Sequence, residues 1–232
     1  AGDGVAASVP APIPIHLIPI HLQPLPEGAR RFRFLDLLRA ETRLLLQGQR
    51  WWWYAVAAGL IIAAFVSPLN AVRQGILPVA WIWPLLLWSA LGNREARYGT
   101  QGLVFSAARP LSRQLPAAWA AGVLLALVTG GAAGLRLALA GDWPAAGAWA
   151  VAALFIPTLA LTLGVWSGGG KLFEVAYLVL WYLGPMQHVP GLDFLGTLPA
   201  TAKAGTPVVF LVATALLGLA AVAGRKRQLR MG

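Results

Sequence analysis

Long apolar blocks, separated by short polar segments, make up most of the chain from residue 51 onward. Each block has 16 to 23 residues, and a helix of that length rises about 24 to 35 Å, which matches the hydrocarbon core of a bilayer. The pattern therefore predicts six transmembrane helices. They cover roughly residues 51–67, 74–91, 117–138, 144–166, 171–186 and 207–224.

Residues 30–50 have a different pattern, in which polar residues recur at helical spacing among leucines and phenylalanines. An Arg-rich helix of this kind suits the membrane interface, with its arginines near lipid phosphates. Amphipathic rings follow at once in the run WWWY, and such rings favour the headgroup level. We predict an interfacial amphipathic helix rather than an ordinary solvated one. Its expected anchors are Arg39, Arg43, Arg50, Trp51, Trp52 and Trp53.

Composition supports a membrane protein. Only 11% of the residues are charged and 58% are hydrophobic, whereas soluble domains carry about 25% charged residues. The predicted fold class is an all-α membrane protein with six transmembrane helices. The chain has no Cys, which excludes disulfides, Cys metal sites and thiol catalysis.

The distribution of basic residues predicts the orientation. If residue 30 begins on the cytoplasmic side, fifteen of the eighteen Lys and Arg residues fall on that side, and Arg73, Arg136 and Lys203 fall outside. Cytoplasmic loops are the ones enriched in Lys and Arg. We therefore expect a multi-pass protein of the inner or plasma membrane with both termini in the cytoplasm. The net charge of +10 then reflects topology, and no nucleic-acid partner is expected.

The predicted organisation has three parts. Residues 1–29 carry six of the seventeen prolines and are interpreted as an extended tether or linker. The interfacial helix over 30–50 follows, and 51–232 form the six-span domain. Within that domain, 92–116 is the longest cytoplasmic loop and 187–206 is an outer loop.

The loop 92–116 combines charges, a Gly-Thr turn and a short apolar run, which is more than a passive connection needs. A short helix against the membrane face, with Glu95, Arg97 and Tyr98 available to a soluble partner, explains the mixture. The alternative is a solvated hairpin between two helices. The candidate docking residues are Arg94, Glu95, Arg97, Tyr98, Gly99, Thr100, Phe105, Arg109 and Arg113.

The segment SGGGKL is similar to an ATP-binding phosphate loop, but it fails the required pattern at two positions, so no ATP site is expected within the chain. The phosphate-loop pattern needs Gly where Val165 stands and a hydroxyl where Leu172 stands. The glycines instead indicate a tight turn between the fourth and fifth spans. Beside it, Lys171 and Glu174 are three residues apart on one helical face, which predicts a local ion pair; a functional intramembrane carboxylate is the alternative.

Other polar and small residues carry weaker signals. Gly130 and Gly134 have the spacing that allows close helix approach, and Pro84 and Pro157 should each kink a span. The outer loop 187–206 suggests a small re-entrant or surface helix that caps a pathway. No nucleophile or metal-ligand set accompanies its His and Asp, so no catalytic site, metal or cofactor is expected.

The order of these features resembles an ABC-2 type transporter permease. The similarity rests on RAETRLLLQGQRWWW, on REARYGTQGLVFSAARPLSRQLPA between the second and third spans, and on FIPTLALTLGVWSGGGKLFEVAYLVLWYLGP before the outer segment and the last span. It extends over residues 30–230.

The resemblance implies an elbow helix at the interface and a loop between spans two and three that docks on a separate ABC ATPase. It also implies a translocation path built from two six-span units. The chain would then be a permease subunit that couples ATP hydrolysis by its partner to export, without being an enzyme itself. The alternative is a non-transporting membrane anchor or assembly factor that recruits soluble partners through the same loop.

Overall fold

The computed structural model describes residues 33–97, 99, 110–189, 191–203 and 205–231. Across these ranges every regular element is a helix and no strand occurs, so the expected all-α class is confirmed. The chain divides into residues 1–32 and Arg33–Gly232. The proline-rich segment 1–29 lies outside the described residues.

In the described part of the chain, three helices are long and apolar enough to cross a membrane: α8 (Pro110–Leu139), α9 (Trp143–Ser167) and α12 (Thr206–Met231). Asp142 caps α9 by accepting a hydrogen bond from the Ala145 backbone N–H. Gly168 ends α9 with φ of 65°, a left-handed conformation that glycine adopts without strain. The helix α10 begins at Lys171, so the glycines form the tight turn that the sequence predicted.

The other expected spans are shorter or interrupted. The first corresponds to α2 (Trp51–Val66), an apolar helix of 16 residues. The fifth consists of α10 (Lys171–Trp181) followed by the π-helical segment η3 (Tyr182–Met186), which contains Pro185. A proline supplies no backbone N–H, so the regular ladder of hydrogen bonds cannot continue through it.

The predicted second span, 74–91 with a kink at Pro84, is a series of short helical segments. Helical structure begins earlier, with α3 (Leu69–Ala71), η2 (Val72–Ile76) and α4 (Leu77–Ile82), and it resumes only in α5 (Leu85–Trp88). The break falls at Pro84, as the expected kink requires. The π-helical segment η2 was not predicted, because an apolar run gives no signal for one widened turn.

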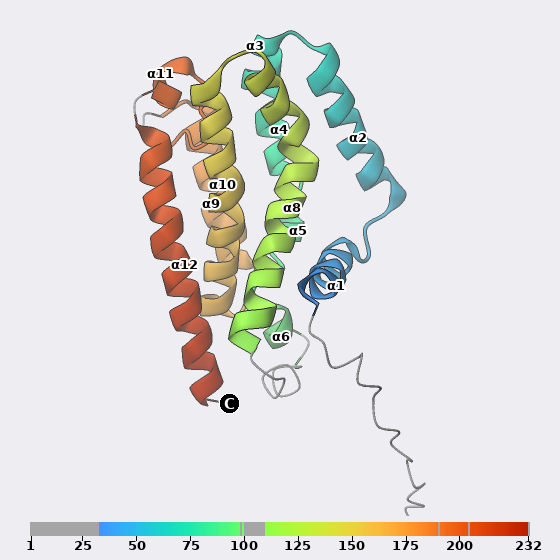
Figure 1. The fold of residues 1–232 in the computed structure, drawn as a ribbon, viewed down its shortest axis with the longest axis vertical. Coiled ribbons are helices and arrows are strands. Elements are labelled where there is room, and N and C mark those ends of the chain that lie inside the picture. The colour runs from blue at the N-terminus through green and yellow to red at the C-terminus, as the bar shows by residue number, and fades with distance from the viewer. Residues whose placement is uncertain (1–32, 98, 100–109, 190, 204, 232) are drawn as a thin grey trace, which may run out of the picture. The chain divides into compact units, whose positions relative to one another are not determined.

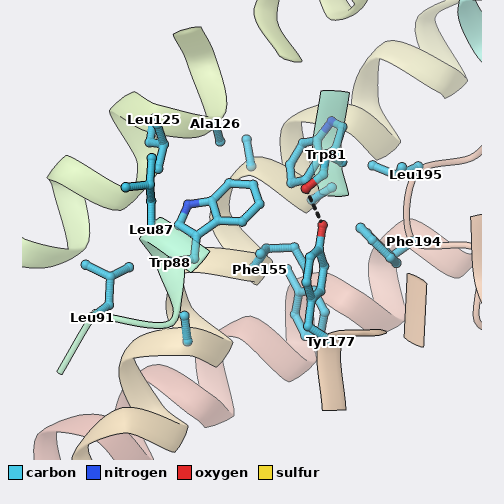
Figure 2. Packing of buried hydrophobic residues seen from close by; sticks show 14 of the residues in the cluster. Trp81, Leu87, Trp88, Leu91, Leu125, Ala126, Phe155, Tyr177, Phe194 and Leu195 are labelled. Atoms are coloured by element: carbon cyan, nitrogen blue, oxygen red, sulfur yellow. Dashed lines mark hydrogen bonds between the residues drawn. The ribbon is translucent and has the colours of Figure 1, made fainter. Parts of the chain in front are cut away.

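Aromatic side chains fill the interior beside α4, α9, α10 and α12 (Figure 2). Trp81 and Trp88 lie 5.6 Å apart between ring centroids, and the Tyr177 ring lies 5.9 Å from Trp88. The Tyr177 hydroxyl donates to the Trp81 carbonyl oxygen at 2.8 Å, which satisfies a polar group within this apolar packing. Phe194 from the loop after η3 enters the same cluster, 6.2 Å from Trp81.

Two glycines of α8 make room for indole rings rather than for a neighbouring backbone. A Cβ on Gly134 would lie 2.4 Å from a Trp149 ring atom, and one on Gly130 would lie 2.9 Å from the Trp81 indole nitrogen. The two glycines therefore allow close packing, as expected, but the groups that pack against them are the indole rings of Trp81 and Trp149.

The elements define two ends (Figure 1). The short helix α6 (Arg94–Arg97) and the end of α12 lie at one end, and α3 and α11 (Pro199–Lys203) lie at the other. In the same view α8 and α12 run vertically, whereas α1 (Phe34–Leu46) is seen nearly end-on beside α8. The most apolar window of α12 is only 17% buried, which leaves a broad apolar face for lipid.

Candidate functional site

The helical turn α6 opens the predicted docking loop, and an ion pair joins it to the first helix. Leu91 and Asn93 just before it are buried, and Asn93 donates through its side-chain amide to the Ser89 carbonyl oxygen at 2.7 Å. Arg94 Nη1 then donates to Glu41 Oε2 at 3.1 Å. This contact attaches α6 to α1, fifty-three residues earlier in the chain.

A second ion pair joins α6 to the last helix. Arg225 Nη2 donates to Glu95 Oε1 at 3.2 Å, and both side chains are at most 10% exposed. Gln114 of α8 donates to the same carboxylate oxygen at 2.8 Å. Arg225 also donates to Gln228, whose amide donates to the Val165 carbonyl oxygen of α9 at 2.7 Å. We call these six side chains the ionic clasp: Glu41, Arg94, Glu95, Gln114, Arg225 and Gln228.

Burial dominates the electrostatics of Glu41 in the ionic clasp. Burial raises the pKa of the Glu41 carboxyl above its usual range, and the neighbouring Glu95 carboxylate acts in the same direction. The Arg94 and Arg225 guanidinium groups oppose this change. Two carboxylates and two guanidinium groups thus share a site with little water, where removal of one charge changes the energy of the others.

The structure revises the role of one predicted docking residue. Glu95 is 8% exposed and faces Arg225 inside the protein, so the expectation that it is available to a partner is wrong. The sequence pattern around Glu95 could not show this, because Arg225 lies 130 residues away in the sequence.

The remaining predicted docking residues are described only in part. Gly99 is exposed with φ of 64°, and Arg113 of α8 is half-buried. The side chain of Arg97 and the whole of Tyr98, Thr100, Phe105 and Arg109 lie outside the described residues. Beside α6, an open cleft of about 560 Å³ lies between the end of α1 and α5 and reaches Asn93 and Arg94.

The Lys171–Glu174 ion pair is present, with 3.1 Å between Nζ and Oε2. The Lys171 side chain is 92% exposed and Glu174 is 19% exposed, so the pair lies at the start of α10 beside the glycine turn. An exposed pair of this type contributes little to stability. Its position favours the local explanation that the sequence analysis preferred.

Most of the predicted interfacial anchors point outward. Arg39, Arg43, Arg50, Trp51 and Trp52 are exposed. Trp53 is the exception, because it is 7% exposed and stacks on Trp83 with ring centroids 6.2 Å apart. Its role is to pack α2 against α4 rather than to anchor the interface.

Within the described ranges, sequence reasoning missed three ion pairs between distant residues. Glu41–Arg94 and Glu95–Arg225 form the ionic clasp, and Arg73 of η2 pairs with Asp142 at the start of α9. One signal could have drawn attention to these carboxylates: the chain has only eight Asp and Glu residues. Each of the six acidic residues in the described part of the chain either pairs with a basic side chain or accepts a hydrogen bond from a hydroxyl group.

The loop 187–206 holds a separate polar cluster around Asp193, which is 1% exposed. Asp193 Oδ2 accepts hydrogen bonds from the Thr201 hydroxyl at 2.6 Å and the Thr197 hydroxyl at 2.9 Å. Since Thr197 gives its proton to Asp193, the His188 Nδ1 atom 3.1 Å away must be the donor in their contact. Across the described ranges, no three His, Cys, Asp or Glu side chains gather closely enough to hold a metal ion.

Comparison with known proteins identifies no relative: no protein family, curated protein or solved structure matches the chain significantly. Function must therefore be inferred from the arrangement of the residues themselves.

Proposed function

We propose that this chain is the membrane subunit of an ABC exporter, in which 92–116 docks on a separate cytoplasmic ATPase. The observation that carries the proposal is the attachment of α6 by ion pairs to both α1 and α12. A loop that merely joined two spans would need neither attachment. A loop that receives force from a partner needs both, because force is passed on only through rigid contacts.

The ionic clasp gives the force a route. Covalent connection alone would carry a displacement of the loop into α5 and α8. Through Glu41 and Arg225 the same displacement also reaches the first and last helices, and through Gln228 it reaches α9. Closure of the ATPase on nucleotide would thus move most of the helices together.

The proposed pathway lies between two six-span units rather than inside one. The interior beside α4, α9 and α10 is filled by rings, including Trp81, Trp88 and Tyr177, each at most 1% exposed. A polar compound would need polar walls, which this packing does not offer. The second unit would be an identical copy, a related subunit or a preceding half. Native mass measurement of the active complex tests this, and an active six-span monomer would refute it.

In the proposed orientation, α6 and both termini face the cytoplasm of a cell membrane, with α1 as an interfacial elbow helix. The charge distribution supports it, since the α6 end carries Arg94, Lys171 and Arg225, whereas Arg73 and Lys203 belong to the other. Single cysteines at positions 70, 107, 141 and 200 can be labelled with an impermeant thiol reagent on intact cells. Labelling at 107, or protection at all three other sites, contradicts the orientation.

Reconstitution tests the function itself. The tagged chain is purified from its native host together with any bound ATPase, placed in vesicles, and assayed for hydrolysis that responds to a transported compound. Arg97→Glu should weaken ATPase binding. The control is Lys226→Glu, which makes an equal charge change at an exposed position of α12 and should leave binding intact. If Arg97→Glu leaves binding and hydrolysis unchanged, the loop is a plain connection. If an ATPase binds but no compound changes its rate, the anchor alternative is favoured.

A further inference from the structure

A crevice with a basic rim lies where α1, α2 and α8 meet. Its inner part has a volume of about 240 Å³ and is lined almost entirely by apolar side chains. It adjoins a more open depression of about 1040 Å³ over α1 that includes Arg39 and Arg43. The two spaces share Thr42, Leu46, Tyr54 and Leu124 as lining residues, so they form one amphipathic site.

Small side chains create the inner crevice. Ala57 and Ala58 of α2 face Ala121 of α8, where larger side chains would close the gap. The crevice runs along α2 from Trp53 to Ile61, and this separation of eight helical steps corresponds to about 12 Å. An apolar space of this shape excludes water and accepts a hydrocarbon chain.

The rim supplies the opposite chemistry. Arg39 and Arg43 are one helical turn apart on α1 and both are exposed. Asp36 reaches Arg39 only at 3.7 Å, in an exposed pair that leaves most of its donors available. Guanidinium groups bind phosphate through paired hydrogen bonds.

We propose that this site binds one anionic glycerophospholipid, with an acyl chain in the crevice and the phosphate on Arg39 and Arg43. Charge argues against a second copy as the occupant of this site, because each of the six acidic side chains in the described part of the chain already has a partner within its own copy. The proposal does not depend on transport. It requires only that α1 lie beside the membrane surface.

Photo-crosslinking tests the site directly. The full chain is placed in phosphatidylcholine vesicles that contain either photoactivatable phosphatidylglycerol or photoactivatable phosphatidylcholine, with the reactive group within the acyl chain. Crosslinked peptides are then mapped by mass spectrometry. The expected result is a concentration of phosphatidylglycerol crosslinks on the α2 and α8 crevice residues, competed by unlabelled phosphatidylglycerol.

Matched variants separate the two parts of the site. Ala58→Phe should fill the crevice and reduce its crosslinks several-fold, whereas Val56→Phe, also exposed on α2 but outside the crevice, should not. Arg39→Gln with Arg43→Gln should remove the preference for phosphatidylglycerol. The control, Lys226→Gln with Arg227→Gln, removes the same charge from α12 and should leave that preference intact.

Three results would overturn the proposal. Crosslinks spread evenly over α12 and the crevice, and unaffected by Ala58→Phe, would show ordinary boundary lipid. Equal labelling by the two lipids in the unmodified chain would remove the role of the arginines. Efficient disulfide formation between copies carrying Ala58→Cys in this Cys-free chain would show that a second copy covers the site.

Discussion

The two ends of the helical unit are closed by different forces. At one end the ionic clasp joins α1, α6, α8 and α12 through charged and amide side chains. At the other, the segment after η3 turns inward and buries Phe194 and Leu195 at 1% exposure or less, with Asp193 tied to its own loop. We call this segment, residues 191–197, the aromatic plug.

The difference shows how each end can behave. Buried charge-assisted hydrogen bonds are strong and directional, so they hold helices in a fixed relation to one another and let them move as one body. Packing of rings in a filled core is lost only when the whole segment withdraws, which leaves a cavity. The ionic clasp is therefore suited to movement under a partner, and the aromatic plug to holding one end of the helices shut.

The largest effect is expected at the aromatic plug. Phe194→Ala removes a ring that contacts Trp81, Phe155, Tyr177 and Phe210, and should destabilise the protein by about 3–5 kcal/mol. Reversible unfolding in mixed micelles measures the change. Phe65→Ala, at 49% exposure, is the control and should change stability little. Equal losses for both variants would mean that the plug is not part of the core.

The second-largest effect on stability is expected at the ionic clasp. Glu95→Ala removes the carboxylate that pairs with buried Arg225 and should cost about 3 kcal/mol, because breaking a buried ion pair is strongly destabilising. A double-mutant cycle with Arg225→Ala should give a coupling energy of about 0.5–3 kcal/mol. Strict additivity would show that the two side chains do not interact, and the proposed route of force through α12 would then lose its basis.

A smaller effect is expected at Asp193. Asp193→Ala leaves the Thr197 hydroxyl and the Leu198 backbone N–H without their acceptor, and the Thr201 hydroxyl with the Leu198 carbonyl oxygen, at a cost of about 1–3 kcal/mol. Asp193→Asn keeps one acceptor oxygen and should cost less. Hydrogen exchange at the Leu198 amide reports the local change. Unchanged protection in Asp193→Ala would refute the role of this carboxylate in ordering the loop.

The smallest effect is a pH dependence at Glu41. Its folded-state pKa is raised above the ordinary value of 4.5, so above that pH the folded protein binds more protons than the unfolded chain. The stabilising contribution is complete below pH 4.5 and is lost as pH rises through the folded-state pKa. Relative to Glu41→Gln, the unmodified protein should lose stability as pH increases across this window. The opposite slope would mean that Arg94 outweighs burial.

Local patterns predicted those features that depend on neighbouring residues. The periodicity of residues 30–50 predicted a helix, which is observed as α1 (Phe34–Leu46). The long apolar runs predicted α9 to within one residue at each end, and they predicted α8 and α12 except for seven residues at the start of α8 and seven at the end of α12. The glycines after Ser167 predicted a turn, and the three-residue spacing of Lys171 and Glu174 predicted their ion pair. Each of these signals is contained in a single turn or a single helix.

Only the tertiary structure decided which side chains meet across the fold. Sequence alone gave Glu95 and Trp53 outward roles, yet Arg225 lies 130 residues from the first and Trp83 lies 30 residues from the second. An apolar run has no period that distinguishes a face toward lipid from one toward protein, so the aromatic plug left no trace in the pattern. The spacing of Gly130 and Gly134 predicted a close contact, but it could not show that indole rings fill it. The physical reason is that polarity sets where a helix can lie, whereas close packing and charge pairing set which helices touch.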